Sequence, residues 1–211
     1  MLPFVIKDDY VKESMGIVEL FPTPVGVIKI DEALNKNILA FLNSNEIKCE
    51  KSIGGNSISV DENFLDNDEL SDVKQVLTDS VNEYFKRTDN PNKDMELYIT
   101  ISWINVIENG EAHHTHHHPN SIVSGVLYID TCEEDTISFV NPRHNMFGNF
   151  SFSHDWNMPV INGRLIMFPS TLDHNVVRRP NTSKGKRISI AFNTWIKGVI
   201  DSGRKATLHL N

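Results

Sequence analysis

Apolar residues recur at helical spacing in two stretches of the first half of the chain. Between residues 31 and 46 they fall at steps of four, one and three, namely Leu34, Ile38, Leu39 and Leu42. Between residues 67 and 87 a longer stripe contains Leu70, Val73, Leu77, Val81, Tyr84 and Phe85. This spacing places the apolar side chains on one face and the charged ones on the other. The pattern therefore predicts two amphipathic helices.

The pattern changes after Asn90-Pro91-Asn92. Short segments rich in β-branched and aromatic residues follow, separated by turn residues, at 95–107, 121–130, 136–140, 163–169 and 187–196. Segments of this kind are typical of a sandwich or a barrel. With no internal repeat in sight, we expect one mainly β domain over residues 1–211. Its flanking helices lie mainly in 31–90 and its β core at about 95–197.

Composition narrows the class of protein. A chain of 211 residues is long enough for one domain with a substantial core. Its net charge of -8 argues against generic affinity for nucleic acid. Cys49 and Cys132 fit no CxxC pattern, so we expect free thiols in a reducing compartment. The acidic start of the chain and the lack of an apolar run of ~18 residues predict a soluble, cytoplasmic protein without a membrane span.

Five histidines occupy six consecutive positions in "HHTHHH", residues 113–118. An expression tag would lie at a terminus, and a loose surface tract that binds metal weakly is the other simple explanation. Side chains alternate along an extended strand, so we expect His114, His116 and His118 on one face. His113 and His117 would then lie on the other face. A His-x-His pair of this kind can place two imidazoles on one metal ion.

A third ligand would have to return from a distant part of the chain. The segment "GRLIMFPSTLDHNV" offers His174, which follows an apolar strand and a short loop. Alone, His174 could equally be a loop histidine that is satisfied by hydrogen bonds. Together with the His-x-His pair upstream, it completes a candidate metal site.

An arginine opens the strand "RISIAFN", thirteen residues after the third histidine. Arg187 shares a strand face with Ser189, and an arginine that points into a barrel is costly unless it meets an anion. A guanidinium can hold a carboxylate through two parallel hydrogen bonds. The alternative is an arginine on an edge strand that pairs with one of the protein's own acids.

The order of these features resembles the iron(II)- and 2-oxoglutarate-dependent oxygenases, whose motif runs His-x-Asp, a distal His and Arg-x-Ser. The chain is similar in particular to small oxygenases of marine bacteria and their phages. The segments that carry the resemblance are "LFPTPV", "SWINV", "HHHPNSIVSGVLY", "FVNPR", "FPSTLDHNV" and "RISIAFN", between residues 20 and 196. The resemblance implies a double-stranded β-helix, which is a jelly-roll, cupin-like barrel with helices outside one sheet.

The resemblance also implies roles for seven residues. Its metal ligands are His116, His118 and His174. Arg187 and Ser189 match the positions that bind the distal carboxylate of 2-oxoglutarate. Asn105 resembles a cosubstrate-binding asparagine of nucleic-acid demethylating relatives. Tyr128 could donate its hydroxyl to the same molecule, although ordinary barrel packing explains Tyr128 equally well.

One ligand position departs from the family pattern. His118 stands where aspartate usually completes two histidines and one carboxylate. Three neutral imidazoles leave Fe(II) with its full charge, which the dianion 2-oxoglutarate can compensate. A site of three histidines also suits zinc, so the identity of the metal stays open. We expect Asp173, beside the distal histidine, to lie behind the ligands or in solvent.

The resemblance implies a dioxygenase that uses Fe(II), 2-oxoglutarate and dioxygen, hydroxylates an unidentified substrate and releases succinate and carbon dioxide. The main alternative is a cupin-like module that binds zinc or another divalent metal and performs no chemistry. A metal-dependent hydrolase or isomerase on the same barrel is a third hypothesis. The sequence leaves the substrate open, is compatible with a homodimer, and would place a phage-encoded protein in the host cytoplasm.

Two further features carry expectations of their own. We expect His114, more than His113 or His117, to orient the metal ligands, because it shares their strand face. Residues 141–160 are long and lack clean periodicity, so they would form a lid, a substrate loop or a packed hairpin. Their ring-bearing members include His144, Phe147, His154 and Trp156.

Overall fold

Helices come from the first part of the chain and most strands from the rest, as the hydrophobic pattern predicts. The computed structural model describes residues 22–89, 91, 94–141, 155–180, 183, 185–200 and 207–210. The α-helices are α1 (Glu32–Ser44) and α2 (Ser71–Asp89), and the short 3-10 helices are Phe64–Asp66 and Asp68–Leu70. No helix in this part of the chain combines the length and apolar character needed to cross a membrane.

Twelve strands occur among the described residues. They are β1 (Gly26–Lys29), β2 (Cys49–Lys51), β3 (Ser57–Ser59), β4 (Met95–Ile107), β5 (His113–His116), β6 (Val123–Asp130), β7 (Thr136–Val140), β8 (Asp155–Pro159), β9 (Arg164–Pro169), β10 (His174–Val176), β11 (Arg187–Ile200) and β12 (Leu208–Leu210). The five predicted strand segments correspond to β4, β6, β7, β9 and β11. The remaining strands are short, and their sequences lack the alternation that would reveal them.

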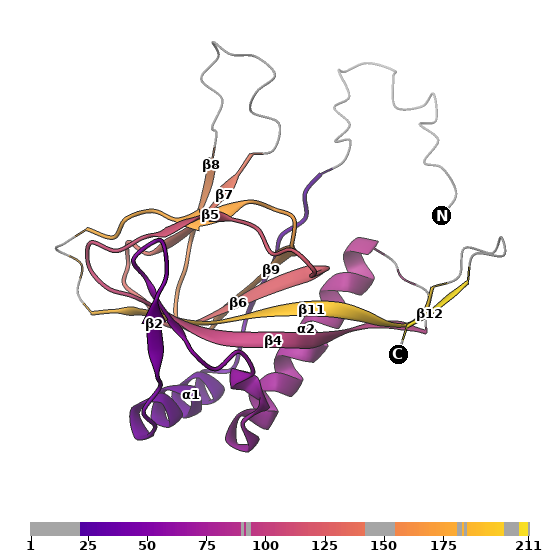
Figure 1. Ribbon diagram of the computed structural model, residues 1–211, viewed down its shortest axis with the longest axis horizontal. Coiled ribbons are helices and arrows are strands. Elements are labelled where there is room, and N and C mark those ends of the chain that lie inside the picture. The colour runs from indigo at the N-terminus through magenta and orange to yellow at the C-terminus, as the bar shows by residue number, and fades with distance from the viewer. Residues whose placement is uncertain are drawn as a thin grey trace, which may run out of the picture.

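The strands form two antiparallel sheets that lie face to face (Figure 1). The larger sheet has the order β1-β9-β6-β11-β4-β3-β2, with β12 paired to β11, and the smaller sheet has the order β5-β10-β7-β8. Helices α1 and α2 cover the face of the larger sheet that points away from the smaller one. The predicted fold class, a jelly-roll barrel with flanking helices, is confirmed.

Alternation along the strands of the larger sheet separates two apolar cores. On β6, Leu127 and Ile129 face the helices, whereas Tyr128 faces the smaller sheet. The outer core joins the sheet to the helix stripes and includes Ile38, Leu77, Val81, Leu97, Ile104, Leu165, Ile190 and Phe192. The inner core, between the sheets, contains Tyr128, Ile137, Phe139, Val160, Ile166, Phe168 and Leu172.

The segment 141–160 is described only in part. Residues 142–154, with His144, Phe147 and His154, lie outside the described residues, so the predicted lid stays a prediction. The end of the segment forms β8, which pairs with β7 in antiparallel register. The extent of the domain over residues 1–211 likewise stays a prediction.

Candidate metal and cosubstrate site

All seven predicted site residues line one cavity between the two sheets. Three strands of the larger sheet contribute every second side chain to it. The predicted site residues among these side chains are Asn105 from β4, Tyr128 from β6, and Arg187 and Ser189 from β11. The smaller sheet contributes histidines from β5, from the residues after it, and from β10. The period-two alternation that buries the outer core thus points the polar residues inward.

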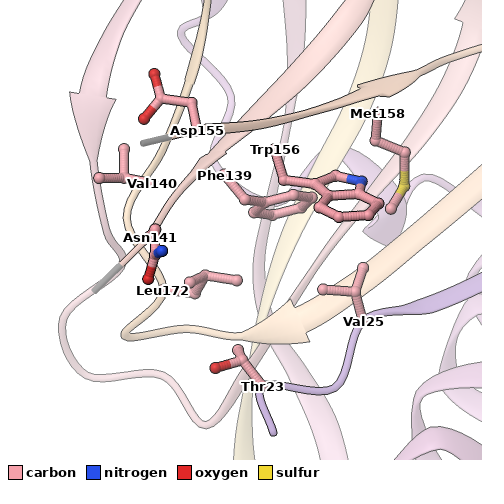
Figure 2. Close-up of a pocket in the computed structure, with 9 residues that line it drawn as sticks. All are labelled: Thr23, Val25, Phe139, Val140, Asn141, Asp155, Trp156, Met158 and Leu172. Carbon is pink, nitrogen blue, oxygen red and sulfur yellow. The ribbon is translucent and has the colours of Figure 1, made fainter. Parts of the chain in front are cut away.

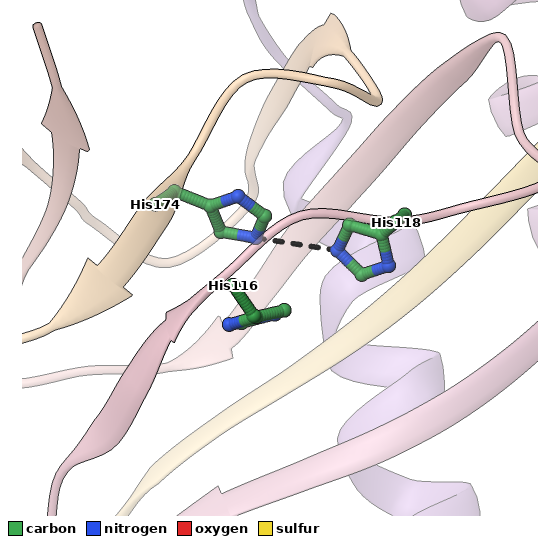
Figure 3. Close-up of side chains that lie close together, drawn as sticks. All are labelled: His116, His118 and His174. Carbon is green, nitrogen blue, oxygen red and sulfur yellow. Dashed lines mark hydrogen bonds between the residues drawn. The ribbon is translucent and has the colours of Figure 1, made fainter. Parts of the chain in front are cut away.

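Three histidines of this cavity point toward one another (Figure 3). One ring nitrogen from each of His116, His118 and His174 lies within 4.8 Å of the others. The Nε2 atoms of His118 and His174 are 3.2 Å apart, joined by a hydrogen bond that one imidazole donates to the other. His174 is opposite His116 in the β10–β5 pairing, so a backbone register holds two of the three rings. The three rings could hold one metal ion.

Backbone carbonyls orient two of the three rings. Nδ1 of His116 lies 2.8 Å from the carbonyl oxygen of His114, and Nδ1 of His174 lies 2.9 Å from that of Leu172. A carbonyl only accepts, so each Nδ1 carries the proton and donates it. The Nε2 atom of each ring is then left with its lone pair, which is the arrangement that metal-binding histidines usually have.

Burial keeps these imidazoles neutral. It lowers the pKa of His118 to about 3 and that of His174 to about 4. The pKa of His116 is also lowered, chiefly by burial. In each case the low-polarity surroundings disfavour the charged imidazolium. At neutral pH all three rings can therefore offer lone pairs.

The predicted alternation of the histidine run is wrong at its first residues. His113 and His116 both line the cavity with stacked rings 4.2 Å apart, whereas His114 is exposed. A bulge explains the difference. His116 pairs with His174 and His113 pairs with Val176, so three steps on β5 correspond to two steps on β10. The extra residue reverses the faces upstream of His116.

The sequence suggested that the side chain of His114 orients a ligand. The structure shows that this side chain is exposed and does not. Its backbone carbonyl does so instead, by accepting from His116. His117 points outward, and its Nδ1 lies 3.0 Å from a carboxylate oxygen of Asp173, with both side chains about half exposed. The expectation that Asp173 lies in solvent, away from the ligands, is confirmed.

A glycine turn supports the bulge from outside the strand. The turn between β2 and β3 places Gly54 directly against β5. A Cβ at Gly54 would lie 2.8 Å from the carbonyl oxygen of Ala112, 2.8 Å from the amide nitrogen of His114 and 3.0 Å from Cα of His113. These neighbours are backbone atoms, which cannot move aside cheaply. The turn therefore requires glycine, and it helps to fix the carbonyl that orients His116.

Arg187 lies deep in the cavity, with 3% of its surface exposed. One terminal nitrogen donates to the carbonyl oxygen of Thr136 at 2.7 Å, and the other donates to the hydroxyl of Tyr128 at 3.2 Å. Its Nε is buried without a hydrogen-bond partner among the described residues. The predicted alternative, a salt bridge to an acid of the protein, is absent from the ion pairs of the described residues. Within the part of the chain that the structure describes, Arg187 is therefore a buried cation with one unpaired donor.

The neighbours of Arg187 add neutral polar groups. Burial raises the pKa of Tyr128, which therefore keeps its phenolic proton. Ser189 is buried on the same face of β11 and pairs with Asn105 across the β4–β11 ladder. The side-chain oxygen of Asn105 accepts from the amide of Asn56 at 3.3 Å. Asn56 lies beside β3, a strand without a hydrophobic pattern, so the sequence did not indicate it.

Sequence reasoning also missed a buried ion pair that contacts the backbone of Ile107, a residue that lines the cavity. Nε of Arg179 lies 2.8 Å from a carboxylate oxygen of Asp135, and their side chains are 2% and 4% exposed. Arg179 also donates to the carbonyl oxygens of Ile107 and Gly185 and to the sulfur of Cys132. These contacts join β4, the turn before β7 and the segment before β11. The arginine pair "VVRRP" gave no sign that one guanidinium turns inward.

Fold and site together define a cupin-like jelly-roll barrel with a three-histidine site. Residues 101–193 match the family model described as "Putative 2OG-Fe(II) oxygenase". The matched segment contains the three histidines and Arg187. The resemblance that the motifs indicated is thus confirmed. No curated protein matches the sequence.

Solved structures share the fold at low sequence identity. HygX from Streptomyces hygroscopicus, with nickel, 2-oxoglutarate and hygromycin B bound, has a TM-score of 0.59 at 13% identity, over 82% of each chain. A prolyl-4-hydroxylase of Pseudomonas putida has a TM-score of 0.56 at 14% identity, over 81% of this chain and 92% of that one. A 2OG-Fe(II) oxygenase family oxidoreductase from Burkholderia pseudomallei has a TM-score of 0.60 at 13% identity, over 81% and 83%.

Proposed function

We propose that the protein is an Fe(II)- and 2-oxoglutarate-dependent dioxygenase that hydroxylates a small or peptidic substrate. Its metal ligands are His116, His118 and His174. Its cosubstrate residues are Arg187, Ser189, Tyr128 and Asn105. The single observation that carries the proposal is the partnerless buried Nε of Arg187, in the same cavity as three convergent neutral imidazoles.

The histidine cluster fits a divalent metal. Two Nε2 lone pairs are already oriented by carbonyls behind the rings, and burial keeps the rings unprotonated. Three imidazoles suit iron as well as zinc, so the donor set does not choose the metal. The family match and the neighbour HygX, solved with iron in one case, support iron.

The floor of the cavity fits the distal carboxylate of 2-oxoglutarate. A guanidinium in a low-polarity site strongly favours an anionic partner, and Nε of Arg187 has none among the described protein groups. Ser189 and the protonated hydroxyl of Tyr128 can add neutral hydrogen bonds to the same carboxylate. The three histidines line the same cavity as Arg187, so one molecule could meet a metal ion through one carboxylate and the guanidinium through the other.

When bound, Fe(II) and 2-oxoglutarate supply the oxidising chemistry, which consumes dioxygen and yields succinate and carbon dioxide. The residues of the chain position and shield these groups. The carbonyls of His114 and Leu172 fix two ligand rings, and Arg187 fixes the far end of the cosubstrate. Apolar walls, among them Trp103, Val126 and Ile137, limit the access of water.

Titration of 2-oxoglutarate into the anaerobic Fe(II) protein tests the proposal, with the metal-to-ligand charge-transfer absorbance as the signal. We expect saturable binding to the wild type. Arg187→Ala removes a charge-assisted contact, which should weaken binding about a hundredfold, or about 3 kcal/mol. Arg187→Lys restores the positive charge but not the planar pair of N–H donors, so it should recover part of the affinity.

The control variant is His117→Ala, because His117 points outward and should leave the titration unchanged. Equal affinity in the wild type and Arg187→Ala would remove Arg187 from the site. No absorbance change in the wild type at about millimolar 2-oxoglutarate, the upper end of typical KM values, would leave the metal-binding module as the better hypothesis.

A further inference from the structure

The cavity that the three histidines and Arg187 line, called the histidine cavity from here on, is separate from the hollow beside Trp156 (Figure 2). That hollow has a volume of about 400 Å³, and the rings of Trp156 and Phe139 lie along one side of it. Its described lining shares no residue with the histidine cavity, because the buried inner core, with Phe168 and Leu172, separates the two. Side chains that contact a molecule at the metal ligands must therefore come from the histidine cavity itself.

His113 lines the histidine cavity but is not one of the rings that converge on a metal position. The convergent group among the described residues is His116, His118 and His174. Within this part of the chain the ring nitrogens of His113 make no hydrogen bond, whereas Nδ1 of His116 and Nδ1 of His174 each donate to a backbone carbonyl. His113 therefore brings an unused hydrogen-bonding group into the cavity.

The ring of His113 stacks on the ring of His116, with centroids 4.2 Å apart and planes inclined by 29°. A stack uses the faces of both rings, whereas the nitrogens of an imidazole donate and accept in the plane of the ring. The contact with His116 therefore leaves both nitrogens of His113 available. It also sets the edge of the His113 ring beside a metal ligand, where a molecule bound to the metal can meet it.

The bulge on β5 is what turns His113 inward. Regular alternation from His116 would place His114 on the inner face and His113 on the outer face. The register shift against β10 exchanges the two, so His113 faces the cavity and His114 is exposed. Bulges occur often beside active sites, where they redirect a side chain. Gly54 packs directly against Cα of His113, which helps to fix this direction.

His113 is a neutral donor near a cation. Burial, followed by the neighbouring histidines and Arg187, lowers the pKa of His113 to about 3. At neutral pH the ring is therefore uncharged and carries one N–H donor and one lone pair. The charges of His116, His174 and Arg187 all act on this pKa, so His113 lies within electrostatic range of both the metal ligands and the guanidinium. A dicarboxylate held by both would have the ring of His113 beside it.

We propose that His113 donates a hydrogen bond from its ring N–H to a dicarboxylate that binds between the histidine ligands and Arg187, and that His113 is not a fourth metal ligand. This inference rests on the proposed function for the identity of the dicarboxylate, which is 2-oxoglutarate. The N–H of His113 joins the donors of Arg187, Tyr128 and Ser189. It favours a carboxylate oxygen over an apolar group at this position, so His113 helps to select the cosubstrate.

His113→Phe separates the two uses of this ring, because phenylalanine keeps a flat ring against His116 but has no N–H donor. Titration of 2-oxoglutarate into the anaerobic Fe(II) protein, followed by the charge-transfer absorbance, should show about tenfold weaker binding than in the wild type. His113→Gln regains an N–H donor without the ring and should recover part of this loss. His114→Phe is the matched control, since the side chain of His114 is exposed and its replacement should leave binding unchanged.

Metal affinity, measured by competition with a chromophoric chelator, shows whether His113 acts on the cosubstrate or on the metal. His113→Phe should bind Zn²⁺ as tightly as the wild type, because the three convergent rings are intact. A loss of metal as large as that in His118→Ala would make His113 a metal ligand and overturn the inference. If His113→Phe does not fold, His113→Leu, which also lacks a donor, takes its place with the same expected results.

Calorimetric titration of the zinc-loaded protein with succinate tests His113 apart from the iron chemistry. Succinate also has two carboxylates and should bind about tenfold more weakly to His113→Phe than to the wild type. Equal affinity of both proteins for 2-oxoglutarate would refute the role of His113 while the proposed function stands. Succinate binding that depends on His113, without any absorbance change on adding 2-oxoglutarate, would support the role of His113 and refute the proposed function. A wild type that binds neither dicarboxylate would refute both.

Discussion

The two faces of the larger sheet differ sharply although the same strands supply both. On β11, Ile190 and Phe192 are buried in the apolar core under the helices, whereas Arg187 and Ser189 face the barrel interior. Along β11, residues that face the barrel interior alternate with residues that face the helices. The difference teaches that a single alternating pattern can encode a stabilising core and a polar site at once. A substitution should therefore change stability or binding according to the parity of its position.

The largest expected effect is on the outer face. Phe192 is fully buried, and its ring lies so close to Gly125 that a Cβ there would come within 2.2 Å of it. Phe192→Ala should lower the free energy of unfolding by about 3–5 kcal/mol, because it leaves a cavity between sheet and helices. Denaturant unfolding measures this loss. Ser189→Ala, on the inner face, should cost less than about 1 kcal/mol; equal losses would refute the division between the faces.

The next effect concerns the metal. His118→Ala removes one of three ligands and should weaken binding of Fe(II) or Zn²⁺ at least about a hundredfold. His114→Ala is its control, because the side chain of His114 is exposed and its carbonyl, which orients His116, is kept. Metal content after dialysis against a weak chelator distinguishes the two. Loss of metal from His114→Ala but not from His118→Ala would show that the ring cluster is not the site.

A smaller effect is expected from the turn outside β5. Gly54→Ala forces a methyl group against the backbone at Ala112–His114 and should shift the carbonyl that orients His116. We expect metal affinity to fall about tenfold, as for other losses of support behind a ligand. Ile53→Ala, a change at a 95% exposed neighbour, is the control. Unchanged metal affinity in Gly54→Ala, measured by competition with a chromophoric chelator, would contradict this role.

The last effect, which is small for each pH unit, is on the pH dependence of stability. Burial lowers the pKa of His113 to about 3, while an unfolded imidazole titrates at about 6.5. A lowered pKa contributes stability that is present above pH 6.5 and is lost as the pH falls toward the folded value. In the metal-free protein the free energy of unfolding should thus be flat above about pH 7 and should fall by up to about 1.4 kcal/mol per pH unit for each buried imidazole below it.

Urea unfolding at several pH values, with chelator present, gives this profile. His113→Gln should make the slope between pH 6.5 and 4 shallower, because one imidazole no longer has to be protonated on unfolding. His117→Gln is the exposed counterpart and should leave the slope unchanged. A wild-type profile that stays flat down to pH 4 would show that the inner-face histidines are not buried.

Much of the fold could be predicted because long strands and amphipathic helices carry strong periodicity. The predicted segments 95–107 and 136–140 coincide with β4 and β7. The same alternation brought Arg187 and Ser189 to one face, and the structure places them in one cavity with the three histidines.

The predictions from sequence failed where the pairing of two strands interrupts the two-residue alternation of side chains. The bulge that turns His113 inward depends on the register with Val176, sixty-three positions away, and nothing in "HHTHHH" announces it. Short strands such as β3 and β8 carry too few residues for a pattern, which hid Asn56 and the position of Trp156. Arg179 was hidden for a different reason, since its partner Asp135 is close only after the barrel has closed.

The buried pair of Arg179 and Asp135 lies at the end of the barrel where β7 begins. Its hydrogen bonds tie Ile107, Cys132 and Gly185 together next to Arg187, so this end is anchored as one unit. At the opposite end β7 stops at Val140 and β8 resumes at Asp155. Chain exchanged between those two residues would leave the anchor intact. The architecture thus lets a designer exchange the segment between β7 and β8 without changing the residues that contact Arg179.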